Sequence, residues 1–501
     1  MLDVPSQTLE RKLHYTLFSL IGVLSLLAVG SLAISYRPVA DDYQQIINVF
    51  ELGSLQNYQE IRDILDSSAF GSLSYYVVFE ILGNSDLRNW VLVIFLQFMI
   101  GTFLLYKLIA ISTGSDRSRN SKLLFGIASL SIIVFSCFGV PQKSYMTFTW
   151  TASFFAHTVP ELLMYILGIA LMLRNPEELN KKMIVLLAVF VSHWGAIDPI
   201  LSLLTIAPIL IWKIAISLQQ SGQPKVFGTA PRFYGIVLGV LLSGVVILVF
   251  GPSSQRRITI SEFQDTNSGD LIERILGIAV LAFRENIISN TISLIMVFAL
   301  GLLAGALKNK FSIKTNLSWS AIFALLFLIV FRKLVLIGAE SFSYFGVWHH
   351  GTASIVLLCF VFLAALKVGE HWNSSSNILL LSFMLFLGGQ VLLVSDMDLQ
   401  SNLIQRAWDE NREANLQNCK TKSFDSNYRF SDFLESPKTS TWQEISCNVS
   451  SNSFFGKKSS FATTPTVLFK IQLNFKQFFD GQVLRFVDNP KTKDSLERQL
   501  Y

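Results

Sequence analysis

Apolar residues in this chain gather into long runs that are separated by short polar segments. Such runs predict transmembrane helices, because about 20 helical residues cross the ~30 Å hydrocarbon core of a bilayer. Eleven runs are found, at about 14–35, 89–111, 123–140, 157–173, 183–194, 200–218, 233–251, 287–307, 317–337, 351–368 and 376–394. The fifth is short and predicts a helical hairpin with the sixth. The pattern therefore predicts an all-α polytopic membrane protein with about 11 transmembrane helices.

A sharp change in composition follows the last apolar run. Residues 395–501 are polar and rich in Ser, Asn and Lys, and at about 105 residues they are long enough for one small domain. Within this segment Thr463–Phe475 and Gln482–Val487 are predicted to be strands. We expect a transmembrane domain, 1–394, with long outer loops at about 37–88 and 252–286, and an extracytoplasmic soluble domain of α/β or β-rich type.

The composition agrees with this class. Charged residues make up 15% of the chain and hydrophobic residues 51%, with a mean hydropathy of +0.48, whereas about 25% of residues are charged in an average soluble domain. The net charge of +5 is modest. In membrane proteins the location of Lys and Arg matters more than their sum, so this charge does not indicate a nucleic-acid partner.

The positions of the basic residues predict the orientation. Arg11 and Lys12 precede the first run, which is interpreted as a retained helix and not as a cleaved signal peptide. With the N-terminus in the cytoplasm, the inner segments carry sixteen Lys and Arg residues and the outer loops carry eight. This asymmetry favours a multi-pass protein of the inner or plasma membrane, with a cytoplasmic N-terminus and an extracytoplasmic C-terminal domain.

The four cysteines fall into two groups. Cys137 and Cys359 lie in apolar runs, where a cysteine usually acts as a small buried hydrophobe. Cys419 and Cys447 both lie in the polar tail. If this tail is exported, a disulfide between them is allowed and would stabilise a small domain. The alternative is two free thiols.

An acidic pair follows the first run directly, within Arg37-Pro38-Val39-Ala40-Asp41-Asp42-Tyr43. Adjacent carboxylates repel each other, which favours the uptake of a proton or of a cation by one of them. Either property suits a general base or a metal ligand. The alternative is that Asp41 caps an interfacial helix that begins near Gln44.

The layout of the chain and the Asp41-Asp42-Tyr43 motif resemble the GT-C class of polytopic glycosyltransferases. Members of that class take a sugar from a polyprenyl-phosphate donor and act on the extracytoplasmic side of the membrane. An acidic residue of their first outer loop serves as catalytic base or metal ligand. The resemblance thus implies that Asp41 or Asp42 is catalytic, and it leaves open whether a divalent cation is the cofactor.

Two pairs of cations are candidates for binding the lipid phosphate, since the guanidinium fork of arginine matches the geometry of a phosphate. Arg256 and Arg257 begin an outer loop, and Arg332 and Lys333 lie near the outer end of the ninth run. The alternative for the first pair is contact with anionic headgroups. For the second pair it is that the side chains extend along the helix to the membrane surface.

Further polar and aromatic residues are candidates for lining a substrate cavity. His157 and Glu161 lie four residues apart on one helical face and could instead form a satisfied interhelical pair. Two such ligands alone do not define a metal site, and His349 and His350 could simply cap a helix start. The whole set is Trp150, His157, Glu161, His193, Asp198, Glu340, His349 and His350.

These residues favour a membrane glycosyltransferase with a polyprenyl-phosphate-linked sugar as donor and a cell-envelope glycan or lipid as acceptor. The sequence has no Walker A motif, no G-x-G-x-x-G after a strand and no H-E-x-x-H, so nucleotide chemistry has no support. The first alternative is a transporter or flippase of lipid-linked glycans, which more often shows internal pseudo-symmetry. The second is a polymerase or ligase of surface polysaccharide outside the GT-C class.

The asymmetry of the basic residues yields a topology prediction. Reporter fusions at Ser115 and after Ser395 are expected to report opposite sides of the membrane, with Ser115 in the cytoplasm. The measurement is the activity of a reporter that functions on one side of the membrane only. Two fusions that report the same side would contradict the prediction.

Overall fold

The computed structural model of the protein describes residues 16, 18–30, 33, 55–56, 58–59, 88–114, 118–138, 148, 151–194, 198–220, 229–251, 291–310, 313–342 and 347–371. This part of the chain is helical and contains no strand. The last predicted run, 376–394, and the tail with its predicted strands and the Cys419–Cys447 disulfide lie outside the described residues.

The described elements occur in the following order along the chain. A helix at Phe18–Gly30 comes first. The others are α5 (Arg88–Thr113), α6 (Arg119–Phe138), α8 (Thr151–Ser153), the π-helix η1 (Phe154–Thr158), α9 (Val159–Leu173), α10 (Lys181–His193), α11 (Asp198–Gln220), α12 (Thr229–Phe250), α15 (Thr291–Lys310), α16 (Trp319–Phe342) and α17 (Val347–His371).

Eight of the described helical segments are long and apolar enough to cross a membrane. They are Leu92–Thr113, Arg119–Cys137, Phe154–Leu173, Pro199–Gln219, Ala230–Phe250, Thr291–Lys308, Trp319–Gly338 and Gly351–Glu370. Each overlaps one of the predicted runs. The first and fifth runs correspond to the shorter helices Phe18–Gly30 and α10. The helical, membrane-spanning character predicted from the sequence is therefore confirmed for this part of the chain.

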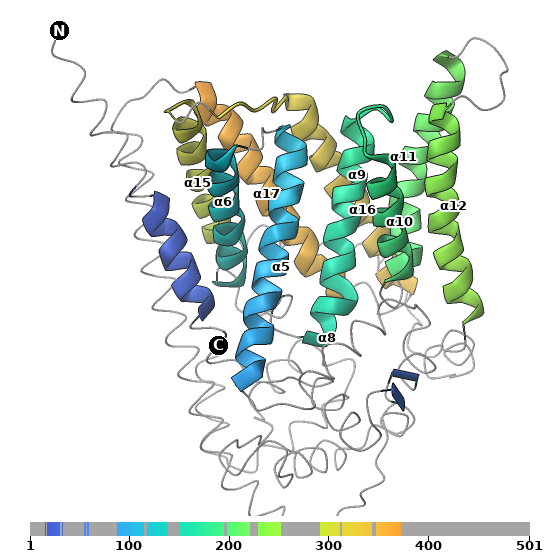
Figure 1. The fold of residues 1–501 in the computed structure, drawn as a ribbon, viewed down its shortest axis with the longest axis horizontal. Coiled ribbons are helices and arrows are strands. Elements are labelled where there is room, and N and C mark those ends of the chain that lie inside the picture. Colours follow the sequence, from blue (N-terminus) through green and yellow to red (C-terminus); the bar gives the residue numbers. More distant parts are fainter. Residues whose placement is uncertain are drawn as a thin grey trace, which may run out of the picture.

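Successive long helices run in opposite directions, so their ends gather at two levels (Figure 1). We call the level at which α5 begins the Arg88 end, and the opposite level the Thr113 end. The helices α11, α15 and α17 and the η1–α9 segment begin at the Arg88 end, and α6, α12 and α16 finish there. The sequence predicts that the Arg88 end is extracytoplasmic.

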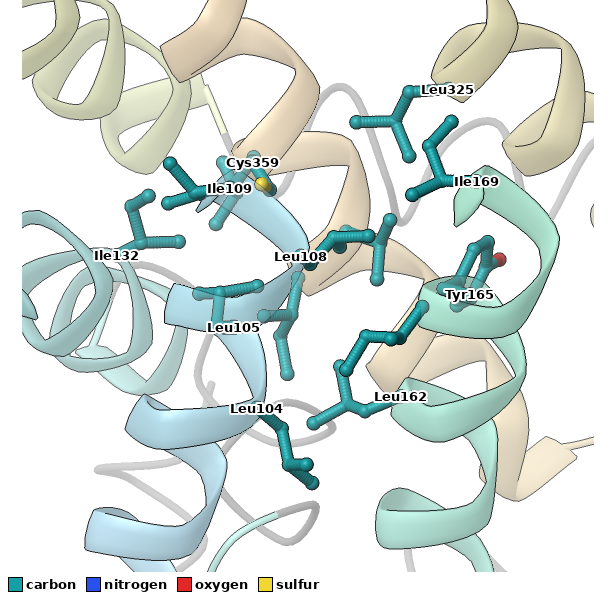
Figure 2. Packing of buried hydrophobic residues seen from close by; sticks show 14 of the residues in the cluster. Leu104, Leu105, Leu108, Ile109, Ile132, Leu162, Tyr165, Ile169, Leu325 and Cys359 are labelled. Carbon is teal, nitrogen blue, oxygen red and sulfur yellow. The ribbon is translucent and has the colours of Figure 1, made fainter. Parts of the chain in front are cut away.

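The helix α9 occupies the centre of the bundle. It packs against α5, α10, α11, α16 and α17, and 78% of its span is buried, compared with 33% for the span in α12. Figure 2 shows Leu105 and Leu108 of α5 facing Leu162 of α9 within a dense apolar core. Residues three apart, such as Leu105 and Leu108, lie on one face of a helix, so their side chains interdigitate with those of the facing helix. Side chains that α9 bears are consequently placed inside the bundle.

The helices α15 and α17 approach each other through small residues. Gly301 and Gly305 lie one turn apart on α15, and they face Ala365 and Gly369 of α17. A Cβ added at Gly301 would lie 2.6 Å from the Cβ of Ala365, and one added at Gly369 would lie 2.6 Å from the carbonyl oxygen of Leu302. This small-xxx-small spacing lets two backbones come close where apolar burial alone gives no drive to associate.

At the Thr113 end, charged groups join the same two helices. The ammonium of Lys308 on α15 donates to Glu370 of α17 at 2.5 Å, and Lys367 donates to the same carboxylate at 2.9 Å. The hydroxyl of Thr315 lies 3.3 Å from that carboxylate. This contact connects the α15–α16 segment to the end of α17.

We predict that a larger residue at the α15–α17 contact destabilises the protein. Gly301→Leu would place side-chain atoms within the van der Waals radii of α17, and overpacking of this kind costs about 1–3 kcal/mol. Gly239→Leu on α12 is the matched control, because nothing lies within 4 Å of a Cβ at that position. The measurement is thermal unfolding of both variants in detergent. Equal unfolding temperatures would contradict the close-packing argument.

Candidate functional site

A buried ion pair connects α16 and α9. The Nε of Arg332 donates to Oε1 of Glu161 at 2.8 Å, and its Nη2 donates to Oε2 of the same carboxylate. The Nη1 donates to the hydroxyl of Thr205 on α11 at 3.1 Å. The exposed fraction is 0% for Arg332 and 1% for Glu161. The guanidinium thus holds the carboxylate in the two-pronged geometry that gives the strongest pairing.

The three helices bring these groups to one depth in the bundle. Glu161, Thr205 and Arg332 each lie six or seven residues from the Arg88 end of their candidate spans. At 1.5 Å of rise per residue, this corresponds to about 10 Å inside that end. An unpaired charge at such a depth is costly in a bilayer, and here each charge is neutralised by the other.

The segment that leads into α9 is a π-helix, η1. Pro160 has no N–H to donate to the carbonyl four residues earlier, and its ring crowds that position, which favours the wider turn. The indole Nε1 of Trp194 donates to the carbonyl oxygen of Phe155 within η1. The half-buried His157 lies in this segment, one turn before Glu161. Single π-turns of this kind frequently occur at functional sites.

A second polar contact lies where α10 finishes. The Nε2 of the half-buried His193 is 3.4 Å from the hydroxyl of Ser243 on α12. Gly244, the next residue, allows this approach, because a side chain there would collide with the backbone of Ser192. The contact between α10 and α12 therefore places His193 next to α12, in the half of the bundle that contains the ion pair.

Two hydroxyl groups flank the ion pair without hydrogen-bond partners in the described part of the chain. They belong to Tyr165, one turn from Glu161 on α9, and to Ser202, one turn from Thr205 on α11. Both side chains are buried. The ring of Tyr165 lies against the apolar core, while its oxygen points away from α5 (Figure 2). Polar groups thus extend over about one turn on either side of the pair.

The structure brings together some of the residues that the sequence singled out. Glu161 and Arg332 form the ion pair, and Lys333 lies beside it in a half-buried position. For Arg332, the alternative that the side chain extends along the helix to the membrane surface is wrong, because this side chain is fully buried. Thr205 is not a candidate from the sequence, because its only signal is its position on a facing helix.

Other candidates lie at or beyond the edge of what the structure describes. The backbone places Asp198 at the start of α11, Glu340 near the end of α16, and His349 and His350 in the first turn of α17, all at the Arg88 end; their side chains lie outside the described part. Outside the described residues altogether are Asp41, Asp42, Trp150, Arg256 and Arg257.

A metal site is not assembled by the described residues alone. Among them, no group of three or more His, Cys, Asp or Glu side chains could hold a metal ion. The divalent cation considered from the sequence remains tied to Asp41 and Asp42.

Compared with models of protein families, with curated proteins and with solved structures, the chain matches none of them.

The ion pair yields a stability prediction. Glu161→Leu leaves the Arg332 guanidinium buried without its anion, and breaking a buried pair from one side costs about 3–5 kcal/mol. The double variant Glu161→Leu, Arg332→Leu removes both charges and is expected to unfold at a higher temperature than either single variant. The measurement is a double-mutant cycle of thermal or denaturant unfolding. Additive losses in the double variant would exclude the coupling.

Proposed function

We propose that the protein is a membrane glycosyltransferase that moves a sugar from a polyprenyl-phosphate donor to a cell-envelope glycan or lipid acceptor on the extracytoplasmic side. One observation carries the proposal: the half of the helical bundle nearest the Arg88 end contains the buried Glu161–Arg332 pair and four buried side chains without hydrogen-bond partners in the described chain, those of Gln97, Thr151, Ser202 and Thr352. Ionisable groups inside a membrane domain are expensive to keep, and they usually mark a functional site.

Chain connectivity supports the same end of the bundle. The segment that contains Arg256 and Arg257 joins the last residue of α12 to the first residue of α15, and both of these lie at the Arg88 end. The segment that contains Asp41 and Asp42 leads into α5 at the same end. The residues proposed for catalysis and for phosphate binding are therefore on segments that attach where the polar half of the bundle begins.

The proposed reaction needs a base, a phosphate site and a place for the sugar. The carboxylate of Asp41 or Asp42 takes the proton of an acceptor hydroxyl, whose oxygen forms a bond to the anomeric carbon of the sugar. The bond from that carbon to the phosphate oxygen breaks, and the lipid phosphate leaves as an anion. Arg256, Arg257 and Lys333 are the proposed cations that stabilise its charge.

The charge of Arg332 alone favours binding of the lipid phosphate, but in this proposal Arg332 positions helices instead. Two nitrogens of its guanidinium are engaged by Glu161 and a third by Thr205. It therefore supports the site by holding α9, α11 and α16 at fixed spacing. Positioning of this kind matters, because displacements of about 1 Å can reduce rates about a hundredfold.

The test of the proposed function is the substitution of the acidic pair. Asp41→Asn and Asp42→Asn preserve size and most hydrogen bonding but remove the base, and loss of a positioned base lowers rates about 10²–10⁴-fold. We expect one of these variants to insert normally and to lose transfer. The measurement is release of polyprenyl phosphate from radiolabelled donors by purified protein in proteoliposomes, with a cell-envelope extract as acceptor.

If Asp41 instead caps an interfacial helix, the Asn variant should keep its transfer activity, since Asn caps a helix nearly as well as Asp. Full transfer activity in both single variants and in the double variant would refute catalysis by this pair. Donor that crosses the bilayer without release of polyprenyl phosphate would instead support a flippase.

A further inference from the structure

Besides Ser202, three further buried polar side chains near the Arg88 end have no hydrogen-bond partner in the described part of the chain. They are the amide of Gln97 on α5, of which neither the oxygen nor the nitrogen is paired, and the hydroxyls of Thr151 on α8 and Thr352 on α17. The exposed fraction of each side chain is 0%. An unpaired polar group destabilises a folded protein when it is buried, so three of them in one region call for an explanation.

The elements that bear these residues meet one another. The helix α5 packs against α17, α17 packs against η1, and η1 continues directly from α8. Gln97 is five residues inside the span that begins at Leu92, and Thr352 is one residue inside the span that begins at Gly351. Thr151 precedes the span that begins at Phe154 by three residues, so each of the three residues lies within about 8 Å, along the helix axis, of the Arg88 end of its span.

Aromatic residues are close to Gln97 and Thr151 along the chain, and their rings contact one another. Phe98, the neighbour of Gln97, stacks on Phe148 with ring centroids 5.4 Å apart, and Phe148 contacts Phe154 at 5.9 Å. Thr151 lies between Phe148 and Phe154 along the chain. Amide and hydroxyl groups in a region that also contains aromatic rings suit a ligand that has both hydroxyls and C–H surfaces.

We propose that Gln97, Thr151 and Thr352 form a binding site for a neutral, hydroxyl-rich group, namely the sugar of the lipid-linked donor. This inference rests on the proposed function and deepens it. The glutamine amide offers two donors and one acceptor, and each threonine hydroxyl offers a donor and acceptor sites, which matches the alternating capacity of sugar hydroxyls. The three side chains carry no charge, so they select for a neutral ring, and the phosphate is left to the basic residues.

The first measurement needs no ligand. Gln97→Met, Thr151→Val and Thr352→Val keep approximately the same volume but remove the unpaired polar atoms, so each variant should unfold at an equal or higher temperature than the parent protein. Ser121→Ala is the matched control, because Ser121 is also a buried hydroxyl without a partner in the described chain, but it lies at the Thr113 end. A lower unfolding temperature in the three variants would show that these groups have structural partners and would overturn the proposal.

The second measurement compares ligands that differ only by the sugar. Decaprenyl phosphate is titrated into the purified full-length protein beside a panel of decaprenyl-phosphate-linked hexoses, N-acetylhexosamines and pentoses. We expect at least one of them to bind about tenfold more tightly than the bare lipid phosphate, as a few neutral hydrogen bonds would provide. The ratio of the Kd of the bare lipid phosphate to the Kd of that sugar-linked lipid should fall to about one in Gln97→Met and Thr352→Val. The Kd of the bare lipid phosphate should stay unchanged in both variants. Ser121→Ala should keep the ratio of the parent protein.

The outcomes separate this inference from the proposed function. If the variants keep the full ratio, or if no sugar in the panel improves binding, the sugar site is refuted, whether or not transfer is observed. If the ratio depends on Gln97 and Thr352 while no polyprenyl phosphate is released by the parent protein, the sugar site holds and the transfer reaction fails. The two ideas therefore do not depend on the same observation.

Discussion

The pairing of Arg332 with Glu161 is the constraint around which the described bundle is arranged. A guanidinium cannot lose its proton at any accessible pH, so a helix that carries one to this depth must bring an anion to the same level. Glu161 meets this need from α9, and Thr205 of α11 accepts from the nitrogen that the carboxylate does not reach. The relative height of three helices is thereby fixed by groups of opposite charge, and apolar packing fills the space around them.

The two ends of the bundle are stabilised by different means. At the Thr113 end, α15 and α17 approach through glycines, and Lys308 and Lys367 share the carboxylate of Glu370. Near the Arg88 end there are a π-helix, the buried ion pair and four buried side chains without partners in the described chain, whereas among the described residues of the Thr113 end Ser121 alone is of this last kind. Close packing favours rigidity, whereas unpaired polar groups lower stability and are commonly kept for function. This difference between the two ends supports a site at the Arg88 end.

The spans could be predicted from the sequence because a bilayer imposes one length and one composition on every crossing helix. The spacing of Gly301 and Gly305 is also typical of a close helix contact, although it does not identify α17 as the partner helix. The pairing of Glu161 with Arg332 could not be predicted, because the two residues are 171 positions apart and several other anionic side chains could have paired with that arginine. The π-helix at Phe154–Thr158 has only Pro160 as a signal, and a proline near a helix start is normally compatible with an ordinary first turn.

Neutralisation inside the bundle has a consequence for ligand selection. Because Glu161 cancels the charge of Arg332 where water is excluded, the buried half of the proposed site attracts neither anions nor cations strongly. Discrimination there must come from hydrogen bonding and shape, for which Gln97 and Thr352 have free capacity within the described chain. Attraction of a lipid phosphate must then come from basic residues nearer the membrane surface, such as the proposed Arg256 and Arg257. A donor with a charged phosphate and a neutral sugar fits this division, since each part meets the environment that its own chemistry requires.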